Sequence, residues 1–105
     1  MESEIKKVLL KFKGELKNNL KEKFIDLILF GSHARGDYSK DSDIDVLLLT
    51  SKNLTKEEKG TISEMRTDMF LKYGIVISYF NYPIKIYEKF RSPFLLNVKK
   101  EGVRI

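Results

Sequence analysis

The chain has 105 residues, of which 42% are hydrophobic and 33% charged, and its net charge is +5 at pH 7. This length predicts one compact domain over residues 1–105, and the composition excludes an intrinsically disordered chain. The absence of cysteine excludes disulfides and thiolate metal sites. We find no apolar run near the roughly 20 residues of a membrane span and no signal peptide, so we expect a cytoplasmic protein without membrane contact.

The first predicted element is an amphipathic helix over residues 3–24. Its apolar side chains recur every three or four positions and form one stripe, made of Ile5, Leu9, Phe12, Leu16, Leu20 and Phe24. Most lysines of this segment fall outside the stripe. We interpret them as a solvated face and do not expect direct binding of nucleic acid. A short apolar strand over residues 25–30 follows.

Residues 31–43 are polar and rich in glycine, serine and aspartate, which predicts a loop with room for a helical turn at its start. Residues 44–50 form a second strand, and its nearly continuous apolar character indicates that both of its faces are covered. Thr55 and Glu58 have the spacing of a capping box. They predict a helix up to about Tyr73, with Gly74 as its stop. We expect four side chains of this helix to point inward: Ile62, Met65, Met69 and Phe70.

The remaining elements are shorter. Residues 75–82 are predicted to form a third strand, and residues 84–90 a helical or irregular segment. Ser92 and Pro93 have the pattern of a helix start, and this helix is expected to run to about residue 100. Residues 103–105 are expected to add an edge strand. Strands that alternate with helices predict an α+β fold, in which helices pack on a single mixed sheet.

The turn after the first strand is a candidate phosphate-binding element. Gly31 has no side chain, so a phosphate can come close to its backbone. If residues 32–35 begin a helical turn, their free N–H groups point at an anion, and Ser32 and Arg35 offer further donors. The alternative is a plain turn without a ligand, which is the more frequent role of a Gly-Ser pair that follows a strand.

Asp43 and Asp45 are candidate metal ligands at the start of the second strand. Side chains alternate along a strand, so both carboxylates are expected on the same side, with Ile44 on the other. Mg²⁺ typically binds one or two carboxylates together with substrate phosphates. A solvated strand end is the alternative. The apolar run that directly follows Asp45 favours the metal, because a charged residue at the start of a buried strand needs a stabilising partner.

Taken together, the segment Gly31-Ser32-His33-Ala34-Arg35-Gly36 and the later Ser42-Asp43-Ile44-Asp45 resemble the signature of the nucleotidyltransferase superfamily related to DNA polymerase beta. The resemblance is greatest to its minimal nucleotidyltransferases, and it extends to residues 73–78 and 92–102. It implies a nucleotidyltransferase fold over essentially the whole chain. It also implies that the triphosphate of ATP is bound by Gly31, Ser32, Arg35 and Ser42, whereas Asp43 and Asp45 are catalytic and bind Mg²⁺.

The sequence departs from this family at one position. Active members usually bring a third carboxylate from the next central strand, but residues 75–82 contain none, and Ser78 lies near the expected place. Three interpretations remain: a slower one-metal enzyme, a carboxylate supplied from elsewhere, such as Asp68 or Glu88, and a nucleotide binder without catalysis. His33 is the only histidine, and we interpret it as a loop residue rather than a general base.

The resemblance also implies a partner. Small members of the family are often encoded beside HEPN-domain proteins, in pairs that resemble toxin–antitoxin systems, and can adenylylate the toxin. We therefore expect Mg²⁺-dependent transfer of AMP from ATP to a HEPN protein. Because the chain has no second domain for an acceptor, a partner or a second copy in a homo-oligomer must bind it. The main alternative is a domain that neutralises its partner by binding alone, and modification of a small molecule such as an aminoglycoside is a third.

Overall fold

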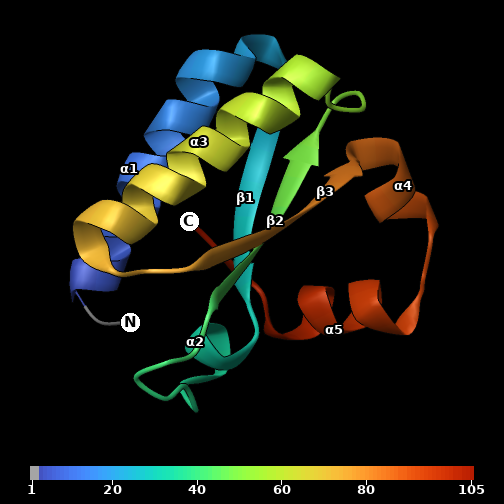
Figure 1. Cartoon of the computed structure of the whole chain (residues 1–105). Helices are drawn as coiled ribbons and strands as arrows, with labels where there is room; N and C mark the ends of the chain where they lie inside the picture. Colours follow the sequence, from blue (N-terminus) through green and yellow to red (C-terminus); the bar gives the residue numbers. More distant parts are fainter. Residues whose placement is uncertain (1–2) are drawn as a thin grey trace.

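A computed structural model describes residues 3–105 as a four-stranded mixed sheet with helices on both faces (Figure 1). In chain order the elements are α1 (Ser3–Leu20), a 3-10 turn (Lys21–Lys23), β1 (Phe24–Phe30), α2 (Ser32–Arg35), β2 (Ile44–Thr50), α3 (Lys56–Tyr73), β3 (Ile77–Pro83), α4 (Ile84–Lys89), α5 (Pro93–Glu101) and β4 (Val103–Arg104). The strand order is β3-β2-β1-β4. β2 runs parallel to β3, and β1 is antiparallel to both β2 and β4. The predicted fold class is confirmed.

α1 and α3 cover one face of the sheet (Figure 1). The stripe of α1 is buried against this face as predicted, except at its end. Phe24 is the first residue of β1 and not a helical residue, so that part of the prediction is wrong. The helix ends at Leu20, and Lys21 adopts a positive φ of 51° within the 3-10 turn that follows. This turn reverses the chain into the sheet.

The other face of the sheet is covered by α4 and α5. Leu47 and Leu49 of β2 point to this face and pack with Val98 of α5, whereas Val46 and Leu48 point to α1 and α3. β2 is therefore buried on both sides, which confirms the interpretation of its apolar run. Phe94 of α5 packs edge-on against Phe30, with ring centroids 5.4 Å apart.

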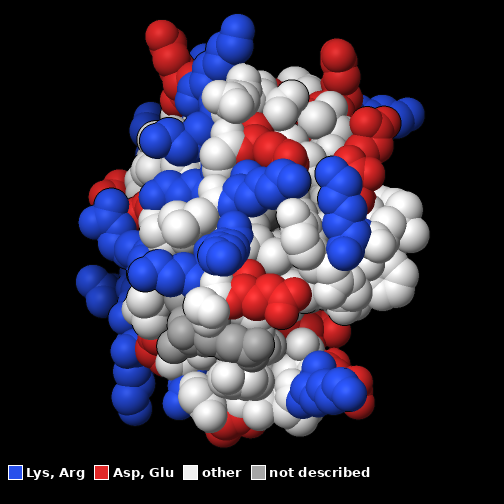
Figure 2. All heavy atoms as spheres, turned by 90° about the vertical axis from the view of Figure 1, so that its left-hand side faces the viewer, with Lys and Arg blue, Asp and Glu red and all other residues white. Residues whose placement is uncertain are grey.

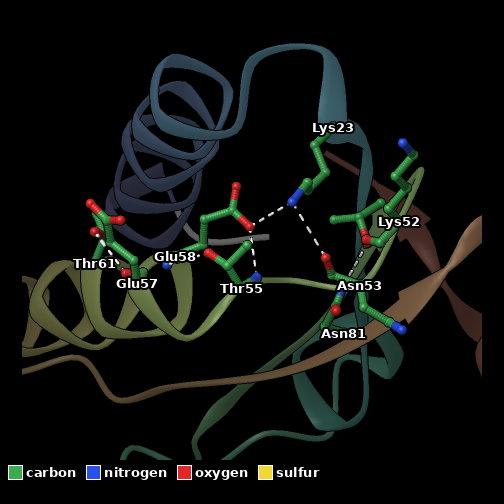
Figure 3. Close-up of polar contacts among 9 residues, drawn as sticks. Lys23, Lys52, Asn53, Thr55, Glu57, Glu58, Thr61 and Asn81 are labelled. Atoms are coloured by element: carbon green, nitrogen blue, oxygen red, sulfur yellow. Dashed lines mark hydrogen bonds and ion pairs between the residues drawn. The ribbon is translucent and has the colours of Figure 1, made fainter.

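The start of α3 is capped as predicted. The Thr55 amide donates to Glu58 Oε1 at 2.8 Å, and the Glu58 amide donates to Thr55 Oγ1 at 3.1 Å (Figure 3). Lys23 also donates to Glu58 Oε1 at 2.8 Å, which joins the 3-10 turn before β1 to the start of α3. These contacts, first that with Lys23 and then that with the Thr55 amide, lower the pKa of Glu58.

One of the four side chains predicted to point inward from α3 does not. Phe70 is 52% exposed, whereas Ile62, Met65 and Met69 are buried. Each residue turns an α-helix by about 100°. Phe70, which directly follows Met69, is therefore rotated away from the buried stripe, and the prediction for it was wrong.

The C-terminal segment is packed tightly against β1. Ser92 Oγ caps α5 by accepting from the Leu95 amide at 3.2 Å, and Pro93 is the first helical residue, as predicted. β4 then pairs with Ile28 and Leu29 of β1. A Cβ added to Gly102 would lie 2.6 Å from Ile28 Cγ2, so the chain leaves α5 through a gap that admits only glycine.

The outer surface is rich in lysine. Lys and Arg side chains gather on the side of the molecule that carries α1, where acidic and neutral residues are interspersed with them (Figure 2). This mixture fits the predicted solvated face. Over residues 3–105 we find no helix with the length and apolar character that crossing a membrane requires.

Candidate active site

The turn after β1 has the conformation that the sequence predicted. Gly31 precedes α2 with φ 78° and ψ −156°, a backbone region that is essentially restricted to glycine. Its carbonyl accepts from the amides of Ala34 and Arg35 at 3.1 and 3.0 Å. Within the described residues, the amides of Ser32 and His33 have no hydrogen-bond acceptor. These two donors are therefore available to an anion.

Asp45 lies directly beside this turn. A Cβ added to Gly31 would stand 2.6 Å from Asp45 Oδ2, so only glycine allows the carboxylate this position. In the β1/β2 ladder, Asp45 pairs with Phe30, the residue before the turn. The antiparallel pairing thus brings the Gly31 turn and the carboxylate of Asp45 together, although they lie 14 positions apart in the sequence.

Asp43 and Asp45 influence each other electrostatically. The pKa of Asp45 is raised, first because the half-buried carboxylate is desolvated and second because of the negative charge of Asp43. His33 and Arg35 act in the opposite direction and favour the ionised form. Asp43 precedes β2, is exposed, and accepts a hydrogen bond from Ser78 Oγ at 3.3 Å.

This donor set fits Mg²⁺. Two negatively charged carboxylates that repel each other are stabilised by a divalent cation between them. Mg²⁺ binds oxygen ligands and keeps coordination positions free for phosphates. Asp43 and Asp45 are the two residues that could hold it. Across residues 3–105, no three His, Asp or Glu side chains gather into a metal-binding group. The described residues therefore offer a site with two carboxylates.

The third carboxylate is not supplied from elsewhere in the described part of the chain. Asp68 and Glu88 are both exposed, on α3 and α4, and neither joins a metal-binding group. Ser78 is the partner of Asp45 in the parallel β2/β3 ladder. The place next to the two aspartates on β3 is thus held by a hydroxyl, which donates to Asp43 instead of binding a cation by charge.

Arg35 makes contacts that the sequence did not reveal. Its Nη1 donates to both carboxylate oxygens of Glu101 at 3.2 Å, and its Nε donates to Asp37 Oδ2 at 3.1 Å. Glu101 Oε1 also accepts from the Gly31 amide at 3.1 Å. An open cavity of about 360 Å³ is lined by residues that include Gly31, Ser32, Arg35, Asp45 and Glu101. Glu101 therefore lies in the site. The only signal for it in the sequence was that it belongs to residues 92–102, which resemble the family.

His33 and Ser42 stabilise the loop between α2 and β2. The buried imidazole of His33 stacks on Tyr38, with centroids 4.4 Å apart, and its Nε2 lies 3.3 Å from the Ser42 carbonyl oxygen. Ser42 Oγ accepts from the Ser39 amide at 2.9 Å. His33 itself lies in α2, and its interpretation as a residue without a catalytic role stays a prediction. A role of Ser42 in nucleotide binding stays a prediction, because its hydroxyl is engaged within the loop.

Solved structures share this fold. A toxin–antitoxin complex with AMP-PNP contains a chain that aligns with a TM-score of 0.62 and 17% identity, over 90% of this chain and 69% of that one. A complex of a tri-AMPylated HEPN toxin of Shewanella oneidensis with its MNT antitoxin aligns with a TM-score of 0.55 and 15% identity, over 92% and 70% of the two chains. A structure named as a putative minimal nucleotidyltransferase aligns with a TM-score of 0.62 and 16% identity, over 95% and 94% of the two chains, so the chain has a nucleotidyltransferase fold.

Sequence comparison identifies the family. The nucleotidyltransferase domain profile matches residues 9–103. A Methanocaldococcus jannaschii protein named "putative protein adenylyltransferase" is 38% identical over 102 residues, which are 97% of this chain and 99% of that protein. The chain therefore belongs to the nucleotidyltransferase domain family, and the predicted enzyme class is confirmed.

Proposed function

We propose that this nucleotidyltransferase transfers AMP from ATP to a side chain of a HEPN-type partner protein, with Mg²⁺ bound by Asp43 and Asp45. The observation that carries the proposal is the position of Asp45 beside the donors of the Gly31 turn, where a Gly31 Cβ would lie 2.6 Å from its carboxylate. The related M. jannaschii protein is named for protein adenylylation. Structures of the same fold are named as toxin–antitoxin complexes, which supports a partner of this kind.

In this proposal the chain binds the triphosphate through the turn. The free amides of Ser32 and His33 and the guanidinium of Arg35 donate to phosphate oxygens, and Gly31 lets the phosphates approach the backbone. Mg²⁺, when bound, would neutralise phosphate charge beside the two aspartates. The Ser78 hydroxyl donates a hydrogen bond to the carboxylate of Asp43 at 3.3 Å, which favours one orientation of this side chain.

The reaction is a displacement at the α-phosphorus of ATP. An oxygen of the acceptor forms a bond to this phosphorus, the bond to the bridging oxygen breaks, pyrophosphate leaves, and the acceptor proton passes to solvent. Such a transfer depends mainly on positioning and charge stabilisation, so it does not require a strong general base in the protein. This suits a site whose β3 position is occupied by Ser78.

A second candidate function is neutralisation of the partner by binding alone. The observation that favours it is the hydroxyl of Ser78 in the register position beside Asp45, where a third carboxylate is expected in active relatives. A hydroxyl is a weaker cation ligand than a carboxylate and a poor base. In this alternative ATP would be a structural ligand of the complex.

The test is label transfer from α-labelled ATP, with Mg²⁺ and a HEPN protein of the same organism. We compare the wild type, Asp43→Asn and the control Glu64→Gln, which removes one exposed carboxylate of α3. Label on the partner with the wild type and the control, but not with Asp43→Asn, supports the proposal. Equal transfer by Asp43→Asn would show that the metal assignment is wrong. A stable complex without label in every case would favour neutralisation by binding.

A further inference from the structure

Arg35, one of the proposed phosphate donors, and the neighbouring Gly31 amide already bind an anion, which belongs to the chain itself. Glu101, the last residue of α5, accepts from the Gly31 amide at 3.1 Å through Oε1. Both of its oxygens also accept from Arg35 Nη1 at 3.2 Å. A carboxylate with two oxygens on a backbone amide and a guanidinium uses the donor types that bind a phosphate group.

Glu101 and a nucleotide phosphate therefore compete for the same groups. The Gly31 amide has a single proton, and it points to Glu101 Oε1. The charge of Glu101 also lies in the cavity that Gly31, Ser32 and Arg35 line. A triphosphate placed there without movement of Glu101 would meet a carboxylate at close range, and like charges at short distance repel strongly in a partly desolvated site.

The backbone at Glu101 is held by contacts on both of its sides. Leu95 and Val98 fix α5 in the core, and the Gly102 amide donates to the Val98 carbonyl at 2.7 Å. β4 follows directly and pairs with β1, and Gly102 has no space for a Cβ beside Ile28. The side chain of Glu101 itself is 24% exposed, so rotation about its own bonds can carry the carboxylate out to solvent.

We propose that Glu101 is an intramolecular competitor of the nucleotide, which occupies the Gly31 amide and Arg35 in the free protein and is displaced by the triphosphate. The inference rests on the proposed function, because it assigns regulation to the same phosphate-binding turn. Its consequence is that two of the donors are engaged by the chain's own carboxylate while the amides of Ser32 and His33 stay free, so the affinity for ATP is lower than all the donors together would give. The effect is local to one side chain and requires no rearrangement of the fold.

Asp37 provides a matched control. It also pairs with Arg35, through Nε at 3.1 Å, but the structure shows no contact of Asp37 with the Gly31 amide over residues 3–105. Asp37→Asn therefore removes the same charge from the same arginine without freeing the donor of the turn. Glu64→Gln, on the exposed face of α3, controls for net charge alone.

The experiment measures binding of sodium tripolyphosphate and of ATP by titration calorimetry. Tripolyphosphate has no nucleoside, so it reports on the phosphate donors only. We expect Glu101→Gln to bind both ligands about tenfold more tightly than the wild type, since a neutral amide competes less strongly for the charged and polar donors than a carboxylate does. Asp37→Asn should have a clearly smaller effect, and Glu64→Gln none. Glu101→Ala, which cannot accept at all, is the second variant if the glutamine variant folds poorly.

Each outcome bears on a different claim. Equal affinity in wild type and Glu101→Gln overturns the competitor while label transfer to the partner still supports the proposed function. Weaker binding by the variant overturns it as well, because Glu101 would then orient Arg35 for the nucleotide. Tighter binding without label transfer supports the competitor and counts against the enzyme. Failure of every variant to bind either ligand overturns both proposals.

Discussion

Gly31→Ala tests the geometry on which the site depends. Gly31 has φ 78° and ψ −156°, a region that costs a residue with a side chain about 1–3 kcal/mol. The new Cβ would also stand 2.6 Å from Asp45 Oδ2, so this carboxylate would have to move. Together we expect a loss of about 2–4 kcal/mol in the free energy of unfolding, within the range of severe single substitutions. Binding of tripolyphosphate should be lost in the fraction that remains folded.

The assay is urea denaturation followed by circular dichroism, together with calorimetry of tripolyphosphate binding. Gly14→Ala is the matched control, because it makes the same chemical change in the exposed middle of α1, where an added Cβ meets no atom within 4 Å. It should stabilise the protein by about 0.5–1 kcal/mol, since alanine has less conformational freedom to lose. This prediction would be wrong if the free energy of unfolding of Gly31→Ala lay within about 0.5 kcal/mol of the wild-type value and its affinity for tripolyphosphate were unchanged. Neither folding nor ligand binding would then depend on the glycine turn.

Three further substitutions test the electrostatics. The pKa of Asp45 is raised by burial and Asp43, so its ionised form opposes folding above the unfolded pKa. Asp45→Asn should therefore raise the Tm of the metal-free protein at pH 7, and this advantage should shrink as pH falls through the raised pKa; a lower Tm at pH 7 would contradict it. The pKa of Glu58 is lowered, so its contribution is present above the unfolded pKa and is lost as pH falls through the folded one. Glu58→Gln should cost about 0.5–1 kcal/mol at pH 7 and nothing in acid, as followed by urea denaturation at both pH values. Ser78→Asp should increase label transfer to the partner in the presence of Mg²⁺ while lowering the metal-free Tm, whereas slower transfer with unchanged ATP affinity would show that this position is not that of a third ligand.

Local signals predicted most of the fold. The bounds of β2 follow from a nearly continuous apolar run, and those of α3 from a capping box at Thr55 and a glycine stop at Gly74, which takes a φ of 67°. Each of these features depends on residues within a few positions of one another. The same holds for the start of α5, where Ser92 and Pro93 are adjacent.

The errors and the omission arise where distant residues decide. Phe24 continues the spacing of the α1 stripe, but pairing of β1 with β2 takes it into the sheet. Phe70 is the exception, because the helical rotation from the buried Met69 already turns it away from the core stripe. Glu101 is 70 residues away from Gly31, so a pattern within one segment could not reveal that the two form a hydrogen bond.

The register of the sheet explains why these residues meet. Asp45 pairs with Phe30 of β1 on one side and with Ser78 of β3 on the other. One row across the sheet therefore contains the residue before the glycine turn, a candidate metal ligand and the position where active relatives have a third carboxylate. In the β1/β4 ladder Leu29 pairs with Val103, which holds the end of α5 close to the turn, where Glu101 accepts from the Gly31 amide. A carboxylate on an outer helix face, such as Asp68, lies outside this row. A change at Ser78 or Glu101 therefore alters the chemistry of the site directly, because each side chain is hydrogen-bonded to a residue of the site.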